Sequence, residues 1–166
     1  MDIVKGQKHD LSSILDIVSN CTKLMKSQGI YQWDEFYPNS DIIENDIKCG
    51  DSYVLKDNGK CVGYFSMNEE EPPEYSQINW FSDGRKVLFT HRLSVDPEFQ
   101  GKGIAKQVLR FIEDFAAKNN YSSIRFDAYS GNKKALKIYE DFHFKKVGQF
   151  NLPTRELPFY CYEKNI

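Results

Sequence analysis

Two glycines lie where a predicted strand gives way to a predicted helix, within the segment LSVDPEFQGKGIAKQVL. Gly101 and Gly103 let a ligand approach the backbone closely, because neither carries a side chain. The free amides and the dipole at the start of the following helix favour an anion such as a pyrophosphate. The type and spacing of these residues predict a phosphate-binding loop, although a simple turn would use the same two glycines.

Two common phosphate-binding motifs do not fit this loop. A Walker A loop requires Gly-Lys followed by Ser or Thr, whereas Lys102 precedes Gly103 here. A dinucleotide-binding fingerprint matches Gly101 and Gly103 and has Asp127 on the next strand, but Lys106 occupies the place of its third small residue. The chain of 166 residues is also too short to build two mononucleotide-binding halves.

The elements that must position the loop follow from apolar periodicity and from turn residues. The dipeptide Asn58-Gly59 predicts a tight hairpin turn, and the strand, helix and strand across residues 87–129 predict a parallel βαβ unit with a right-handed crossover. In chain order, we expect a strand at 1–5, helices at 10–29 and 41–48, strands at 52–56, 60–67 and 87–95, a helix at 103–118, a strand at 124–129, a helix at 132–141, and strands at 144–150 and 159–163. This order predicts a three-layer α/β fold with a mixed sheet.

Composition and charge exclude several classes of protein. With 40% hydrophobic residues, among them 12 Phe and 10 Tyr, the chain has enough apolar material for a folded core. It contains no run of about 20 apolar residues and no signal peptide, so we expect a cytoplasmic protein without a membrane partner. The net charge of −2 argues against general nucleic-acid binding. The four scattered cysteines form no CxxC pair, which predicts reduced thiols and neither a metal site nor a disulfide framework.

Two short patterns carry a resemblance to a known family. The loop fits Q/R-x-x-G-x-G/A, and a later segment fits N-x-x-A-x-x-x-Y. Together with the order of elements, they resemble the GNAT superfamily of acetyl-CoA-dependent N-acetyltransferases over essentially the whole chain. One departure is His143, which stands where the family usually has Gly. The residues that match are Leu93, Ser94, Val95, Gln100, Gly101, Lys102, Gly103, Ile104, Ala105, Asn132, Ala135 and Tyr139.

The resemblance implies a single N-acetyltransferase domain over residues 1–166, with a three-layer α-β-α fold. Its sheet would be mixed, mostly antiparallel and six- to seven-stranded, and would splay at the central parallel pair. The matching residues would bind acetyl-CoA, with CoA as the product. Local charge suits such a polyanion, because residues 101–137 carry eight basic and three acidic side chains, although solvated lysines on helix surfaces would give the same count.

The resemblance also implies that Tyr139 is the general acid, since the matching tyrosine of the family commonly protonates the departing thiolate. A phenol with an ordinary pKa of about 10 keeps its proton at neutral pH. The base that takes the proton of the amine is less clearly marked. His91 alternates onto the same face as Val95, and Glu69, Glu70 or Glu71 could act through water. Packing in the core is the alternative for both Tyr139 and His91.

We expect acceptor specificity to lie outside the cofactor motifs, in loops that hold Trp33, Tyr37 and Trp80. Aromatic walls with carboxylates suit a cationic amine, although ordinary packing would also explain each aromatic residue. We therefore predict direct transfer of an acetyl group to a primary amine of a small molecule. A protein or peptide amine as the acceptor, or a catalytically silent acyl-CoA-binding and sensing module, are the alternatives. A homodimer is common in the family, and no surface in the sequence marks such an interface.

Overall fold

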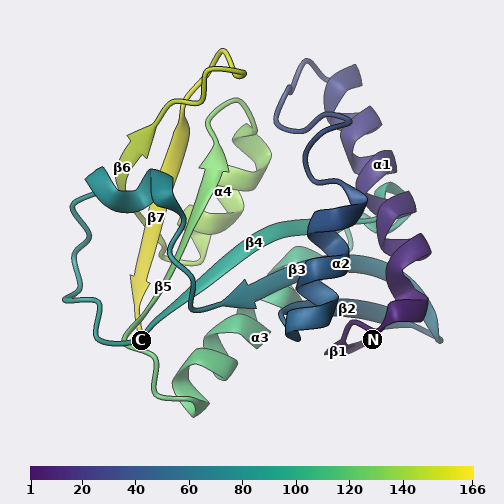
Figure 1. Cartoon of the computed structure of the whole chain (residues 1–166), viewed down its shortest axis with the longest axis horizontal. Helices are drawn as coiled ribbons and strands as arrows, with labels where there is room; N and C mark the ends of the chain where they lie inside the picture. Colours follow the sequence, from purple (N-terminus) through teal and green to yellow (C-terminus); the bar gives the residue numbers. More distant parts are fainter. The chain divides into compact units, whose positions relative to one another are not determined.

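The chain forms two compact units, and strand β4 (Val87–Val95) contributes residues to both. The computed structural model describes residues 1–166. The first unit comprises residues 1–67 and 91–108, and the second comprises residues 68–90 and 109–166. The strand order of the mixed sheet is β1-β2-β3-β4-β5-β7-β6, which confirms the predicted α/β class (Figure 1). No helix combines the length and the apolar character that crossing a membrane requires.

The first unit is built on antiparallel strands joined by the predicted hairpin, in which Asn58 and Gly59 both adopt positive φ. Its first helix buries Ile14, Val18 and Cys21, which lie on one face because their spacing follows the helical period. The two helices of this unit lie side by side in Figure 1. The elements are β1 (Asp2–Lys5), η1 (Lys8–Asp10), α1 (Leu11–Ser27), α2 (Ser40–Cys49), β2 (Ser52–Asp57) and β3 (Lys60–Asn68).

The second unit contains the parallel pairing at the centre of the sheet. Here Val87–Phe89 of β4 pair with Ser123–Arg125 of β5, so that three residues of each strand take part. Two neighbouring strands that splay apart can form hydrogen bonds only over a short run of residues, and this pairing is short. Further antiparallel strands complete this part of the sheet. The elements are η2 (Pro73–Gln77), α3 (Ile104–Lys118, which belongs to this unit from Leu109), β5 (Ser123–Tyr129), α4 (Lys133–Asp141), β6 (Lys145–Phe150) and β7 (Phe159–Asn165).

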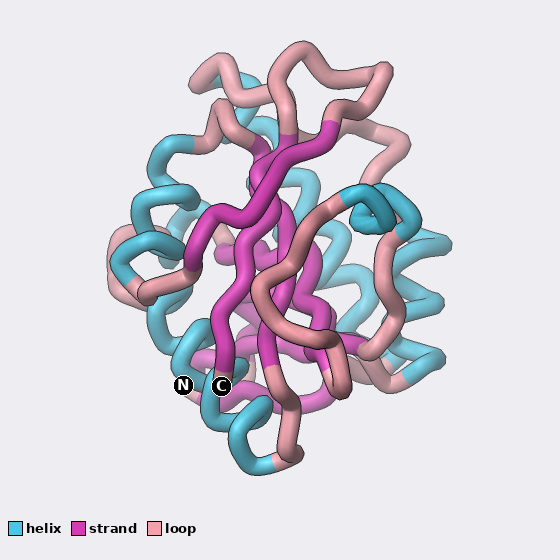
Figure 2. The backbone as a smooth tube through the Cα atoms, turned by 90° about the vertical axis from the view of Figure 1, so that its left-hand side faces the viewer, coloured by secondary structure: helices cyan, strands magenta, loops and turns pink.

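Alternate residues of β5 face opposite sides of the sheet in the second unit. On one side, Phe126 packs against Tyr139 of α4, with ring centroids 4.5 Å apart. On the other side, Asp127 accepts a hydrogen bond from Tyr75 of η2. Figure 2 shows long loops flanking this short helix. Strand β5 therefore presents Phe126 to α4 and Asp127 to η2.

The turn after α4 forms although His143 stands where the family usually has glycine. His143 has a φ of +64°, a left-handed conformation that costs a residue with a side chain about 1 kcal/mol. The His143 N–H donates to the Glu140 carbonyl at 2.9 Å, and the Phe144 N–H donates to the Tyr139 carbonyl at 3.1 Å. These two hydrogen bonds close the end of the helix. The departure from glycine therefore leaves the turn intact.

Candidate active site

The predicted phosphate loop lies in the first unit, between the end of β4 and the start of α3. The short helix η3 (Pro97–Phe99) follows the strand, and Gln100 then folds back toward it. The side-chain amide of Gln100 donates a hydrogen bond to the Val95 carbonyl at 3.0 Å. Because this bond ties the loop to the strand end, residues 101–103 are presented to solvent.

The loop backbone requires glycine at two positions. Gly101 and Gly103 have φ values of +79° and +78°, which side chains rarely tolerate. A Cβ atom at either position would meet nothing within 4 Å, so the space beside the loop is open. Helix α3 is 15 residues long, and the amides of its first turn have no partner within the helix. Open backbone beside free helix amides fits a pyrophosphate, and the exposed Lys102 and Lys106 add positive charge.

Strand β4 carries the other predicted cofactor residues of the first unit. Ser94 and Val95 are buried, whereas Leu93 is half-buried. The Ser94 hydroxyl donates to the carbonyl of Arg92 at 2.8 Å. Arg92 has a φ of +59°, so the regular β backbone is interrupted in the middle of the strand. Sequence reasoning missed this feature, because arginine carries no signal for a left-handed conformation.

The Arg92 side chain is the centre of a buried polar network. Its guanidinium donates to Asp46 at 2.6 Å and to the Ser66 hydroxyl at 2.9 Å. The Tyr64 hydroxyl also donates to Asp46, and a further N–H of Arg92 donates to the Tyr37 hydroxyl at 3.2 Å. A buried ion pair is tolerated only where such hydrogen bonds satisfy both partners. The network therefore fixes α2 and the loop before it against the irregular point of β4.

His91, the predicted base, is half-buried beside this network. Burial and the positive charge of Arg92 lower the pKa of His91 to about 3. The imidazole is therefore neutral at pH 7 and is a weak proton acceptor. This property disfavours a role as the base that deprotonates an amine.

The later motif residues lie in the second unit, on α4. The Asn132 side chain accepts the Ala135 N–H at 3.2 Å and so caps the N-terminus of the helix. The N-x-x-A spacing is therefore explained by helix capping, without reference to a ligand. Two turns further on, the Tyr139 ring packs against Phe126 and lies 6.0 Å from the Tyr162 ring. Burial and the Asp127 carboxylate raise the pKa of Tyr139 to about 12, so the phenol keeps its proton at neutral pH.

The three aromatic residues predicted to shape the acceptor site differ in placement. Trp33 is 8% exposed and packs in the core of the first unit. This placement fits the alternative of ordinary packing. Tyr37, in the same unit, is 39% exposed. Trp80, in the second unit, is half-buried under the Arg125 guanidinium, which lies 4.5 Å above its ring. Tyr75 lies on another side of Trp80, with ring centroids 5.2 Å apart.

A buried carboxylate anchors the loop that contains Trp80. Glu163 of β7 accepts the Phe81 N–H at 2.5 Å, the Ser82 hydroxyl at 2.5 Å and the Arg125 Nε–H at 3.0 Å. Burial acts to raise the pKa of Glu163, but the hydrogen bonds from Ser82, Phe81 and Arg125 outweigh it and lower the pKa. The loop is thus held on the same face of the second unit as Asp127.

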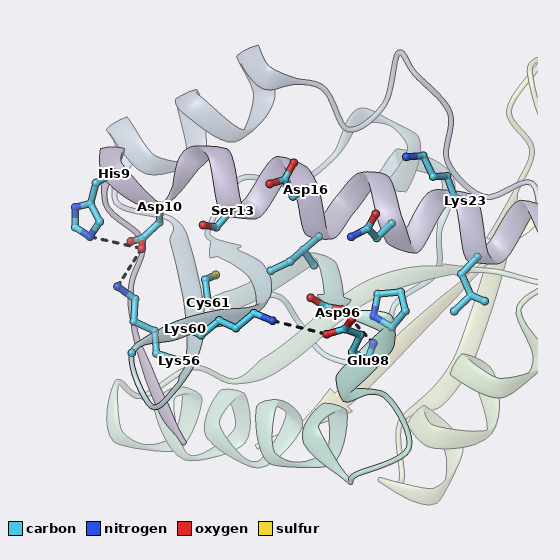
Figure 3. A pocket seen from close by; sticks show the side chains of 15 residues that line it. His9, Asp10, Ser13, Asp16, Lys23, Lys56, Lys60, Cys61, Asp96 and Glu98 are labelled. Carbon is cyan, nitrogen blue, oxygen red and sulfur yellow. Dashed lines mark hydrogen bonds and ion pairs between the residues drawn. The ribbon is translucent and has the colours of Figure 1, made fainter.

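A pocket of about 880 Å³ lies along α1 in the first unit (Figure 3). Two ion pairs lie among its charged side chains: Lys56 lies 3.0 Å from Asp10, and Lys60 lies 3.7 Å from Glu98. None of the predicted site residues lines it. The pocket is therefore distinct from the predicted phosphate loop, although η3 contributes to both.

Comparison with known sequences identifies the family. The sequence model of the acetyltransferase (GNAT) family matches residues 16–144, which is more than half of the chain. The N-acetylaspartate synthetase of Danio rerio is 43% identical over 107 residues, which make up 64% of this chain and 37% of that protein. N-acetyltransferase 8B of Mus musculus is 31% identical over 98 residues, which make up 59% of this chain and 39% of that protein. The chain thus spans less than half the length of these curated relatives.

Solved structures give the same fold. A GNAT-family acetyltransferase of Streptococcus agalactiae aligns with a TM-score of 0.86 at 21% identity, over 99% of this chain and 95% of that one. One from Listeria monocytogenes aligns with a TM-score of 0.78 at 22% identity, over 99% of this chain and 94% of that one. The sequence match and the shared fold together show that this chain belongs to the GNAT family of acetyltransferases. The resemblance drawn from the loop and the later helix is confirmed at the level of the family.

Proposed function

We propose that this chain uses acetyl-CoA to acetylate the primary amine of a small molecule by direct transfer, without a covalent enzyme intermediate. The observation that carries the proposal is the loop after β4, where Gly101 and Gly103 adopt left-handed conformations beside open space at the start of α3. Membership of the GNAT family supports acetyl-CoA as the donor. The name of one relative, N-acetylaspartate synthetase, supports a small-molecule acceptor.

Acetyl-CoA would supply the acetyl group as an activated thioester. In the first unit, the loop amides would bind the pyrophosphate, since helix N-terminal amides stabilise negative charge. The β4 backbone would supply further amides to the donor. The residues proposed to contact acetyl-CoA are Leu93, Ser94, Val95, Gln100, Gly101, Lys102, Gly103, Ile104, Ala105, Asn132, Ala135 and Tyr139.

Tyr139 is the proposed general acid. Its Oη keeps a proton at neutral pH because the pKa of the phenol is about 12. That proton can be donated to the sulfur as negative charge develops there. We assign His91 no step, because a pKa of about 3 makes its imidazole a weak base. Of the aromatic residues, Tyr37 and Trp80 are the proposed acceptor contacts, because they are not confined to the core as Trp33 is.

Calorimetric titration with acetyl-CoA tests the loop with a matched pair of variants. Gly103→Glu places a side chain and a negative charge beside the proposed pyrophosphate site. Gly59→Glu is the control, because Gly59 has a similar φ of +82° and equally open space, but lies in the hairpin of β2 and β3. We expect binding near one equivalent for the wild type and Gly59→Glu, and none for Gly103→Glu. Equal binding by both variants would show that the loop does not hold the donor.

A further inference from the structure

The pocket along α1 is large enough for a ligand of its own. Its volume of about 880 Å³ falls within the range of about 300–1,000 Å³ that is typical of sites for small organic molecules. All of its lining residues belong to the first unit. The chain has no group of three or more His, Cys, Asp or Glu side chains that could hold a metal ion. The pocket therefore suits an organic molecule rather than a metal.

Asp96 is a buried carboxylate in the wall of this pocket. Its residue is 9% exposed, and its Oδ1 accepts the Glu98 N–H at 3.0 Å. No other hydrogen bond and no ion pair of the chain involves this carboxylate. Burying a charge is costly unless a partner of opposite charge compensates it. A cation in the pocket would supply that partner.

The lysines of the pocket are paired with other carboxylates. Lys56 lies 3.0 Å from Asp10, toward the other end of the pocket in Figure 3. Lys60 lies 3.7 Å from Glu98, and these two side chains are 60% and 77% exposed. Solvent screens a pair as exposed as this one, so it has little influence on a buried neighbour. The negative charge of Asp96 is therefore not cancelled by these lysines.

Two thiols near Asp96 respond to its charge. Burial raises the pKa of Cys21 to about 11, and the Asp96 carboxylate acts in the same direction. Burial also raises the pKa of Cys61, with Asp10 and Asp96 adding to the effect. Both thiols are therefore protonated and uncharged at neutral pH. Cys61, which lines the pocket, contributes a neutral surface beside the carboxylate.

An apolar surface lies next to Asp96. The Cys21 thiol donates to the Val95 carbonyl at 3.1 Å, so this turn of α1 lies beside the residue that precedes Asp96. Residues one turn before Cys21 and one turn after it share its face of the helix. The apolar residues that line the pocket in this region are Ile17, Leu24 and Pro97. A ligand that reaches Asp96 with a charged group can therefore place an apolar body against them.

We infer that this pocket binds a small aliphatic amine as its ammonium ion. The ammonium group donates to Asp96, and the aliphatic body packs against Ile17, Leu24 and Pro97. A hydrogen bond between two charged groups is strong where solvent is partly excluded, and the apolar contacts add to it. None of the residues proposed to bind acetyl-CoA or the acceptor lines the pocket. The inference is therefore independent of the proposed function.

Two-dimensional NMR of the ¹⁵N-labelled full chain, titrated with 3-methylbutylamine in the absence of acetyl-CoA, tests the inference. The Glu98 amide is the reporter because it donates to Asp96. The Ile42 amide is the internal control, because it donates to the Asn39 side chain at 3.1 Å at the start of α2. We expect the Glu98 signal to move saturably with the amine while the Ile42 signal stays in place. 3-Methylbutan-1-ol, which has the same body without the charge, should move neither signal at the same concentrations.

A matched pair of variants tests the carboxylate itself. Asp96→Asn removes the charge but keeps an oxygen that can accept the Glu98 N–H, so the start of η3 is preserved. Because a hydrogen bond to a charged group is lost, we expect the Kd for 3-methylbutylamine to rise at least about 10-fold. The control is Asp16→Asn, which removes an exposed carboxylate that lines the same pocket and should leave the Kd within about twofold.

Three results would overturn the inference. The first is a wild-type Glu98 signal that does not move saturably with the amine. The second is an equal movement of this signal with the alcohol, which would show that the charge plays no part. The third is a Kd for Asp96→Asn equal to that of the wild type. The comparison of amine and alcohol needs only the wild type, so it tests the charge independently of any variant.

Discussion

Removal of one oxygen atom from Tyr139 tests its role as the general acid. In Tyr139→Phe the ring is retained, so its packing against Phe126 at 4.5 Å and beside Tyr162 at 6.0 Å is preserved. The variant should therefore fold with a stability close to that of the wild type. Only the hydroxyl group is lost, so any change in turnover reports on that hydroxyl.

The size of the effect follows from the chemistry of the group. A positioned general acid contributes about 100- to 10,000-fold to a rate. With a pKa of about 12, Tyr139 is protonated throughout the range in which an enzyme of this kind is assayed. We therefore expect kcat to fall at least 100-fold in Tyr139→Phe, with no loss of wild-type rate between pH 7 and pH 10 from ionisation of this residue. The dissociation constant for acetyl-CoA should change less than threefold.

The matched control is Tyr162→Phe. Tyr162 belongs to the same ring cluster, and its hydroxyl donates to Glu140 at 3.2 Å. Release of the CoA thiol, with a primary amine that the wild type acetylates as acceptor, measures turnover in both variants. We expect Tyr162→Phe to keep its kcat within about twofold of the wild type. A kcat for Tyr139→Phe that matches the control would remove Tyr139 from the acid role.

Three further predictions concern stability, and thermal denaturation measures each. Glu163→Gln should cost about 3 kcal/mol because it leaves buried Arg125 without its charge partner. Since the folded-state pKa of Glu163 is lowered from 4.5, its contribution should be complete above about pH 4.5 and be lost as the pH falls further. Asp46→Asn should cost a similar amount because it breaks the ion pair with Arg92, and a change below about 1 kcal/mol would contradict the network. His143→Gly should stabilise the chain by about 0.5–1 kcal/mol by relieving its positive φ, whereas a loss of stability would show that the His143 side chain makes compensating contacts.

The order of elements could be predicted from the sequence because local signals mark it. Asn58-Gly59 forms the predicted hairpin turn with two positive φ values. Gly101 and Gly103 likewise adopt the left-handed conformations that only glycine takes up readily. The family followed from the same loop and from the motif ending at Tyr139. In each case a short stretch of chain determines its own conformation.

The partners of charged residues could not be predicted, because they depend on contacts between distant parts of the chain. Asp46 and Arg92 are 46 residues apart, and no local pattern connects them. Tyr75 and Asp127 are 52 residues apart, and no local pattern predicts the hydrogen bond between them. His91 looked suitable as a base by its ordinary pKa, but burial lowers that pKa to about 3. Burial and tertiary contacts decide such roles.

The most direct test of the proposed function is whether acetyl-CoA is consumed in step with an amine. Mass spectrometry can follow the wild-type protein incubated with acetyl-CoA and each of a set of small primary amines, with the amine omitted as the control. We predict equal amounts of CoA and the N-acetylated amine, formed only when both substrates are present. Acetyl-CoA that binds the folded protein but is recovered unchanged with every amine supplied would contradict the account and favour a silent acyl-CoA-binding module.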